Sequence, residues 1–446
     1  MKFKLDEYRA LATKQEGYEE AAKRFYDEVD RVSKNRWKII KTSLDLCSRC
    51  GACSEECPYY NVTREEIYNP IYRVNLLREL YSRNYGVFGR LRRSLGRNRV
   101  SPEEIQALSE NLYRCTMCRR CSLFCTFKVD NSLIVREGRV ILSNLGIAPR
   151  EIDEGVRMQL SVGTVTGMTR DGFLDIINFM KEEIKEKKGK SIDIPIDRKG
   201  VEMLLLHNSG DYLSFMEDVM GITEVLEAAG ASWTLNTEFN EAVNYGLYYS
   251  DDILLRILKK HLEVARKLEV KRIVIGECGH AYKALKIFKR LLPEESKDFE
   301  ILSILQVTDD YIRRGKLNLD PTKNKEPVTL HDSCNFARMG GIIEEPRRIL
   351  KACVMDFREM YPNREYNYCC GGGSGLGLIT HNKFLEWRMK VAGRKKVDQI
   401  KATGAKIVAS SCANCKIQFR ELIRYYNLDC RYSGIHELVA NALVYR

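Results

Sequence analysis

The sequence lacks any long apolar stretch. No run in its 446 residues approaches the roughly 18 consecutive apolar residues that a membrane span needs. The first 37 residues alternate charges and contain neither the apolar segment nor the cleavage site of a secretory signal, which argues against export. We therefore expect a chain that does not cross a membrane by itself and works on the cytoplasmic side.

Acidic residues are scarce in one part of the chain. Between Tyr72 and Val100 there are eight arginines and a single acid, Glu79. Such a segment could bind an acidic partner, an anionic membrane surface or nucleic acid. The alternative is a solvated helical face between two motifs.

Cysteine is abundant, with 16 residues, but a long chain without an export signal favours metal or redox use over disulfides. Eight of them form two groups with the spacing of the bacterial ferredoxin run. The first group is followed by Pro58, whereas Thr126 replaces that proline in the second. The groups are Cys47, Cys50, Cys53 and Cys57, and Cys115, Cys118, Cys121 and Cys125.

Two such runs predict two cubane [4Fe-4S] clusters in crossed ligation, in which the fourth cysteine of each run binds the other cluster. One cluster would be held by Cys47, Cys50, Cys53 and Cys125, and the other by Cys115, Cys118, Cys121 and Cys57. A pair of zinc sites is the alternative, but zinc prefers separated pairs of cysteines. A helix should lead into the second group, because Ser101, Pro102 and Glu104 form a capping box with proline at the first helical position.

The second half of the chain changes to short apolar runs rich in β-branched residues, which predict buried strands of an α/β domain. These runs are 202–207, 232–236, 271–276, 299–303, 327–332 and 405–410. The half also repeats itself, because "EMLLLHNSGDY" resembles "PVTLHDSCNFA" and "KRIVIGECGHAYKALKIF" resembles "AKIVASSCANCKIQFREL". Matched spacing between the repeats suggests two related lobes.

The expected fold class is α plus α/β, an α-helical ferredoxin-type domain with two clusters followed by a two-lobed α/β domain. The expected parts are a charged helical segment at 1–40, the ferredoxin domain at 41–145, a connector at 146–195, and the α/β domain at 196–446. Its lobes would be 196–326 and 327–446.

Five further cysteines stand where apparent strands give way to loops, the edge at which α/β sheets place ligands. They are Cys334, the adjacent Cys369 and Cys370, and Cys412 and Cys415. The glycines after Cys370 permit positive φ angles and supply amide donors. We expect the five thiols to converge on a cluster, the alternative being a redox-active pair with incidental cysteines. Cys353 and Cys430 belong to no motif and should be buried apolar residues.

These cysteines, with Gly371 after the doublet, resemble the CCG domain of heterodisulfide reductases. Together with the two ferredoxin runs, the chain resembles the family of D-type heterodisulfide reductase subunits, and most of all its DsrK/TmcB/HmeD branch in sulfate-reducer membrane complexes. The resemblance implies a noncubane [4Fe-4S] cluster that cleaves a disulfide-type bond with electrons from the cubanes. Its implied ligands are Cys334, Cys369, Cys370, Cys412 and Cys415.

The first lobe departs from the family pattern. Its aligned positions are Gly210, Asn244, Tyr245, Cys278 and Ala281, so one thiol remains and we expect one noncubane cluster. The departure favours a protein disulfide or trisulfide as substrate. Cys278 could trap a mixed disulfide and His280 could deliver protons as catalytic residues; alternatively, both are relics packed between the lobes.

The resemblance implies the catalytic iron-sulfur subunit of a respiratory complex on the cytoplasmic face of the membrane, held there by a cytochrome b-type subunit and other subunits. Electrons, from menaquinol through the cytochrome, would reduce a disulfide or trisulfide on a DsrC-like protein. The alternative is an electron-transfer subunit of a flavin dehydrogenase of the glycolate or glycerol-3-phosphate type. A zinc scaffold that binds nucleic acid is disfavoured by the thiol spacing and by the lack of aromatic stacking motifs.

Overall fold

The computed structural model describes residues 15–248, 250–380 and 382–445. They form two compact units. Unit 1 contains Met1–Asp153, Tyr248–Ser250 and Gly371–Lys395, and unit 2 contains Glu154–Leu247, Asp251–Cys370 and Lys396–Arg446. Part of the helical segment expected at 1–40 falls on residues 1–14, outside the described residues.

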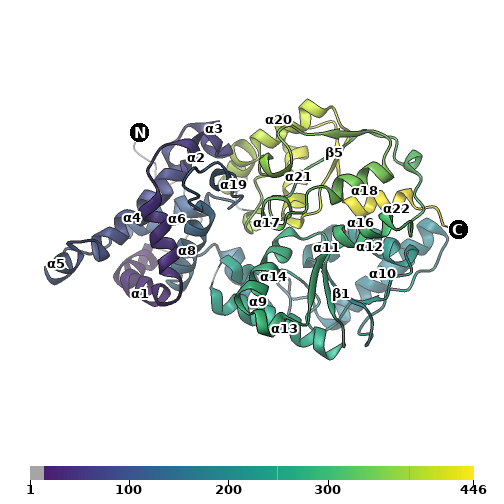
Figure 1. The fold of residues 1–446 in the computed structure, drawn as a ribbon, viewed down its shortest axis with the longest axis horizontal. Helices are drawn as coiled ribbons and strands as arrows, with labels where there is room; N and C mark the ends of the chain where they lie inside the picture. The colour runs from purple at the N-terminus through teal and green to yellow at the C-terminus, as the bar shows by residue number, and fades with distance from the viewer. Residues whose placement is uncertain (1–14, 249, 381, 446) are drawn as a thin grey trace. The chain divides into compact units, whose positions relative to one another are not determined.

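Unit 1 is helical. Its long helices α1, α4, α6 and α8 pack against one another (Figure 1), and their facing residues Ile105, Leu108, Leu112, Ile134 and Val135 are fully buried. The helices are α1 (Gln15–Leu46), α2 (Ala52–Glu56), α3 (Pro58–Thr63), α4 (Pro70–Tyr85), α5 (Gly89–Ser94), α6 (Pro102–Tyr113), α7 (Arg120–Leu123), α8 (Asn131–Asn144) and α19 (Asn382–Trp387). The capping box predicted for α6 is confirmed, because the Glu104 amide donates to the Ser101 hydroxyl and the Ser101 amide donates to the Glu104 carboxylate.

Unit 2 contains two four-stranded parallel sheets. The first has the order β2-β1-β3-β4 and the second β6-β5-β7-β8, so the two lobes share one topology. The strands are β1 (Met203–Leu206), β2 (Trp233–Thr234), β3 (Arg272–Ile275), β4 (Glu300–Ser303), β5 (Val328–Leu330), β6 (Phe357–Glu359), β7 (Ile407–Ala409) and β8 (Arg431–Ser433). The predicted fold class, α plus α/β, is confirmed.

Helices cover both sheets of unit 2. They are α10 (Arg170–Lys188), α11 (Ser209–Ser214), α12 (Met216–Ala228), α13 (Asp251–Lys267), α14 (Gly279–Leu291), α15 (Pro293–Ser296), α16 (Ile304–Arg313), α17 (Ala337–Gly340), α18 (Glu345–Cys353), α20 (Arg394–Thr403), α21 (Ala413–Tyr425) and α22 (Ile435–Ala442). The helix α9 (Arg150–Val162) begins in unit 1 and continues in unit 2.

The compact units differ from the expected domain ranges in three places. Helix α1 runs through the expected boundary at residue 40. Helix α10, in the expected connector, buries Phe173 and Ile177 in the same core as Met203 and Leu205 of the first sheet. Residues 371–395 lie in the second half of the sequence but belong to unit 1.

Candidate iron-sulfur sites

The first four predicted cubane ligands line one cavity of unit 1. The segment between α1 and α2 supplies Cys47 and Cys50, α2 supplies Cys53, and the loop after α7 supplies Cys125. Val74 of α4 closes the cavity from the side. Because Cys125 belongs to the second motif but lies with three cysteines of the first, the arrangement is the crossed one expected from the spacing.

A second cavity of unit 1 gathers the other four cysteines, Cys57, Cys115, Cys118 and Cys121. Here Cys57 is the member that comes from the first motif. Its thiol lies 3.6 Å from the carbonyl oxygen of Tyr68 and is buried. Each cavity therefore offers four thiols, the donor set of a [4Fe-4S] cluster.

The two motifs share an unusual backbone conformation. Arg49 and Met117 occupy the third position of each motif and have φ angles of 62° and 50°, while Gly51 and Arg119 occupy the fifth position and have 90° and 63°. Left-handed residues in this pattern turn successive amides toward one point, which suits an anionic cluster. In the second motif the Met117 amide donates to the Cys115 sulfur at 3.4 Å.

Two fully buried arginines hold the second motif. Arg73 donates to the carbonyl of Arg114, and Arg139 donates to the carbonyl of Cys115 at 2.6 Å. Burial acts to lower the pKa of Arg73, but the Cys115 and Cys57 thiols outweigh it, so the pKa is raised. The sequence alone does not predict that these two arginines hold the motif. It places Arg73 instead in the arginine-rich segment that could bind a partner.

The segment 371–395 packs within unit 1 against the same motif. The Ser374 hydroxyl donates to the Thr116 carbonyl at 2.7 Å. The Trp387 ring stacks on Tyr68 with 6.3 Å between ring centroids, and the Arg114 guanidinium lies 5.5 Å from the Trp387 ring centroid. The residue that starts this segment, Gly371, is bonded directly to the predicted ligand Cys370.

The five remaining predicted ligands all belong to loops of the second lobe in unit 2, apart from Cys415 in the first turn of α21. Because β5 and β7 are adjacent parallel strands, the loops that follow them, with Cys334 and Cys412, open at one edge of the sheet. Each of the five cysteines is no more than 6% exposed.

The thiols of this group interact with one another. The Cys415 thiol is hydrogen-bonded to both Cys370 and Cys412. A hydrogen bond from the Cys415 thiol lowers the pKa of Cys412, against the effect of burial, and the amides of Cys415 and Gly279 contribute in the same direction. A thiolate that receives several hydrogen bonds is a ready metal ligand, so the donor set fits an iron-sulfur cluster.

His331 belongs to the same site, although sequence reasoning used it only to align the two lobes. Its ring nitrogen and the sulfurs of Cys370 and Cys415 lie within 4.8 Å of one another. Burial lowers the pKa of His331 well below its usual value, so the ring is neutral. Its position directly after β5, two residues before Ser333, is the signal that could have identified it.

The two predicted catalytic residues have different surroundings. Cys278 is 1% exposed, burial and then the neighbouring Cys412 raise its pKa, and the Asn208 amide lies 3.8 Å from its sulfur. The His280 Nε2 atom lies 2.7 Å from the Asn244 carbonyl oxygen, and its ring packs on Tyr245. Burial lowers the pKa of His280 to about 4.

The two cysteines outside every motif differ in burial. Cys353 is buried, as predicted, whereas Cys430 is only partly buried. Cys430 lies directly before the edge strand β8, where one side of the chain has no neighbouring strand to cover it. The prediction of a buried Cys430 is therefore wrong.

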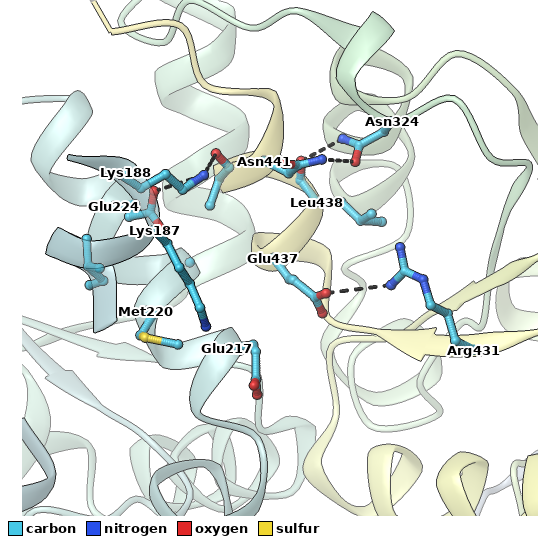
Figure 2. A pocket seen from close by; sticks show the side chains of 13 residues that line it. Lys187, Lys188, Glu217, Met220, Glu224, Asn324, Arg431, Glu437, Leu438 and Asn441 are labelled. Atoms are coloured by element: carbon cyan, nitrogen blue, oxygen red, sulfur yellow. Dashed lines mark hydrogen bonds and ion pairs between the residues drawn. The ribbon is translucent and has the colours of Figure 1, made fainter. Parts of the chain in front are cut away.

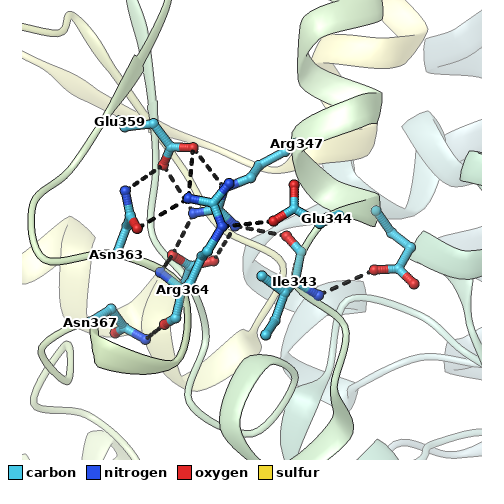
Figure 3. A network of polar contacts seen from close by, with 9 residues as sticks. Ile343, Glu344, Arg347, Glu359, Asn363, Arg364 and Asn367 are labelled. Carbon is cyan, nitrogen blue, oxygen red and sulfur yellow. Dashed lines mark hydrogen bonds and ion pairs between the residues drawn. The ribbon is translucent and has the colours of Figure 1, made fainter.

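A buried ion-pair network fixes the loops that carry the ligand cysteines (Figure 3). Arg347 of α18 binds both carboxylate oxygens of Asp332 at 2.7 and 2.8 Å and also binds Glu359 at 2.7 Å. The Arg364 amide donates to the same Asp332 carboxylate at 2.6 Å. Asp332 precedes Cys334 by two residues and Arg364 precedes Cys369 by five, so the Asp332 carboxylate, which Arg347 holds in place, connects the two ligand loops.

A cavity elsewhere in unit 2 contains none of the predicted site residues (Figure 2). Its cations are engaged, because Lys188 pairs with Glu224 at 3.5 Å and Arg431 pairs with Glu437 at 3.6 Å. Among the described residues, no cysteine lines this cavity, so it is not a candidate iron-sulfur site.

Two segments of the chain match models of known protein families. Residues 43–129 match the family model of a 4Fe-4S dicluster domain, and residues 328–420 match that of the cysteine-rich CCG domain. The Hdr-like menaquinol oxidoreductase iron-sulfur subunit 2 of Archaeoglobus fulgidus is 28% identical over 93% of this chain and 82% of its own length. The D-type subunit of the dihydromethanophenazine:CoB--CoM heterodisulfide reductase of Methanosarcina barkeri is 25% identical over 92% of this chain and 97% of its own.

The chain carries a 4Fe-4S dicluster domain and a CCG domain, and over most of its length it is similar to D-type heterodisulfide reductase subunits. A more distant relative, the EtfAB:quinone oxidoreductase of Syntrophomonas wolfei, is 25% identical over 87% of this chain and 56% of its own length. The two matched domains and the similar proteins together indicate an iron-sulfur oxidoreductase subunit with [4Fe-4S] clusters. Among the helices of the described residues, none has the length and apolarity to cross a membrane.

Proposed function

We propose that this chain is the catalytic iron-sulfur subunit of a membrane-associated respiratory complex that reduces a disulfide or trisulfide. The observation that carries the proposal is the presence, in one chain, of two four-thiol cavities and of a third group of five buried cysteines, in which Cys415 is hydrogen-bonded to Cys370 and Cys412. Cys47, Cys50, Cys53 and Cys125 would hold one cubane cluster, and Cys57, Cys115, Cys118 and Cys121 the other. Cys334, Cys369, Cys370, Cys412 and Cys415 would hold a noncubane [4Fe-4S] cluster.

A noncubane cluster at the five-thiol site would supply electrons to a sulfur-sulfur bond. Two electrons and two protons convert a disulfide into two thiols. Cys278, beside Cys412, would trap one sulfur of the substrate as a mixed disulfide. The pKa of about 4 keeps the His280 ring neutral at pH 7. His280 would therefore relay each proton by binding it only briefly.

The substrate is proposed to be a disulfide or trisulfide on a DsrC-like protein. The support is that the first lobe retains one thiol, Cys278, of the five aligned positions, which leaves one noncubane site. Electrons would come from menaquinol through a cytochrome b-type membrane subunit, a direction suggested by the name of the Archaeoglobus relative.

Attachment to the cytoplasmic face of the membrane through partner subunits is proposed for the same complex. The part of the arginine-rich segment suited to docking is 87–99, since Arg73 is buried and Arg78 donates to the Cys47 carbonyl. In 87–99, Val87 is 95% exposed and Phe88 is 66% exposed. Four arginines of the same segment are also exposed, namely Arg92, Arg93, Arg97 and Arg99. Apolar and basic side chains together suit an anionic membrane surface or the partner protein beside it.

The test is an anaerobic measurement of iron and acid-labile sulfide in the purified chain. We expect about twelve irons per chain for three [4Fe-4S] clusters. Cys370→Ser should lose about four of them, and Cys353→Ser, which alters a buried thiol outside every group, should lose none. A wild-type value near eight irons, or equal loss in both variants, would contradict the five-thiol site.

Substrate chemistry is tested separately by EPR spectroscopy. Oxidation in the presence of a DsrC-like protein in its thiol form should produce a paramagnetic signal that Cys370→Ser abolishes. The purified chain with a reduced dye should also convert the disulfide form into thiols. If the chain has its full iron content but gives neither result, it transfers electrons without reducing the disulfide itself, and the proposed catalytic role is contradicted.

The alternative function is an electron-transfer subunit of a flavin dehydrogenase without its own substrate site. Similarity to the EtfAB:quinone oxidoreductase and to the probable iron-sulfur-binding oxidoreductase FadF of Bacillus subtilis favours it. A flavoprotein that co-purifies from membranes, with no disulfide reduction by the chain itself, is the result expected from this function. A co-purifying haem-bearing subunit is expected from the first.

A further inference from the structure

A lysine is buried beside the five-thiol site. Lys396 of α20 is 0% exposed, and it lies close enough to Asp332, Cys370, Cys369 and Cys415 for their negative charges to oppose the effect of burial, which lowers its pKa. Burying an ammonium is costly unless negative charge compensates it. No carboxylate of residues 15–248, 250–380 and 382–445 forms an ion pair with it, because the nearby Asp332 is bound by Arg347. Asp332 acts on Lys396 without a direct ion pair, and the further negative groups around the ammonium are the thiols of Cys370, Cys369 and Cys415.

The ammonium is held in place by two neighbours. It donates to the Gln399 side-chain oxygen and lies 3.6 Å from the Met360 sulfur. The amide nitrogen of Gln399 donates to the Pro362 carbonyl at 2.7 Å, which fixes the orientation of its oxygen. An ammonium has three hydrogens, so one remains for the thiol side of the pocket.

The first lobe provides an internal comparison. Its helix α13 stands before β3 in the chain as α20 stands before β7. The buried residues of α13 are Leu254, Ile257, Leu258, His261, Leu262, Val264 and Ala265. The lobe that retains a single thiol thus buries no lysine on the corresponding helix, whereas the lobe with five thiols does.

We propose that Lys396 is a positioning residue that raises the reduction potential of the cluster held by Cys369, Cys370 and Cys415. A fixed positive charge favours the reduced state, which carries one more negative charge, and net charge and hydrogen bonds to sulfur set cluster potentials. Burial lowers the pKa of Lys396 to about 8, so the side chain is cationic at pH 7. The inference rests on the proposed function, because it needs a cluster at that site.

The test is a redox titration followed by EPR on the full chain, using the signal that Cys370→Ser abolishes. Lys396→Met should lower the midpoint potential of that signal, while Lys396→Arg, which keeps the charge, should remain near the wild-type value. Lys401→Met, on the exposed side of the same helix, is the matched control and should not shift it. An unchanged midpoint in Lys396→Met with full iron content overturns the proposal.

Iron retention is compared in the same variants, so that a variant that loses the cluster is also informative. Loss in Lys396→Met and Lys396→Gln with retention in Lys396→Arg supports a requirement for the charge. Equal loss in all three variants shows that only the shape of lysine matters and overturns it. Absence of the signal from the wild-type chain refutes the proposed function, whereas a normal signal without a shift refutes the role of Lys396 alone.

Discussion

Replacement of Lys416 by methionine should destabilise unit 2 more than any other single change of a charged side chain there. Lys416 of α21 is surrounded by three carboxylates of the first lobe. Its Nζ atom lies 3.0 Å from Asp211 and 3.6 Å from Glu277, and it also pairs with Asp218. All four side chains are at most 3% exposed. Lys416 is thus a buried ionic connection between the two lobes.

The magnitude follows from what the substitution leaves behind. Removal of one partner from a buried ion pair costs about 3–5 kcal/mol, because the other charge stays buried without compensation. Here three carboxylates would lose their shared cation, so the upper end, about 5 kcal/mol, applies. That is a large fraction of the roughly 5–15 kcal/mol that stabilises a folded domain.

Asp218→Asn is the matched control. Burial, with repulsion from Glu277 and Asp211, raises the pKa of Asp218 well above its usual value even though Lys416 opposes it. Asparagine keeps this side chain neutral, which is the form that the raised pKa favours, so we expect a cost of no more than about 1.5 kcal/mol for the lost hydrogen bonds. Urea unfolding followed by circular dichroism and iron content should show a large shift for Lys416→Met and a small one for Asp218→Asn. Equal shifts in the two variants, or a wild-type midpoint for Lys416→Met, would refute the reasoning.

Three further predictions concern single side chains. Arg347→Met should cost about 3–5 kcal/mol by leaving the Asp332 carboxylate buried alone and should lower the iron bound at the five-thiol site, as seen by thermal melting and iron analysis. Cys353→Ser and Cys430→Ser should keep the wild-type iron content, since both thiols lie outside the three groups. Burial raises the pKa of Glu110 from 4.5 to about 8, so its stabilising contribution is full below pH 4.5 and lost as pH rises through 8. Glu110→Gln should reduce that loss, measured by urea unfolding at pH 5 and 8; equal pH dependence in both proteins contradicts it.

Prediction from the sequence succeeds where a local pattern decides the structure. All six predicted strands are present, because runs of β-branched and apolar residues such as 271–276 satisfy a sheet buried on both faces. The strands β6 and β8 were missed, since Phe357–Glu359 and Arg431–Ser433 are short and polar. Both are edge strands, where charged residues are tolerated.

Long-range packing leaves no comparable mark in the sequence. Whether an arginine is exposed or buried depends on carbonyl groups far away in the chain, as the bonds of Arg139 to Leu112 and Cys115 show. The arginine-rich segment therefore contains both buried and exposed arginines, and its composition does not tell them apart. The positions of Lys396 and His331 near the site likewise follow only from the fold, which brings Cys370 and Cys415 next to them.

The glycine run after Cys370 illustrates how packing changes the interpretation of a motif. The sequence predicts that these glycines wrap a cluster and donate amides. In the structure Gly371 has a φ angle of 100°, and a Cβ atom there would lie 2.8 Å from the Ala392 carbonyl carbon. A Cβ atom on Gly373 would lie 3.1 Å from the Thr116 carbonyl oxygen, the group that Ser374 also binds. Gly373 is therefore needed for the close approach of this segment to the second cysteine motif, and Gly371 for packing within the segment on Ala392. A side chain at either position would disturb this packing although no predicted ligand is changed.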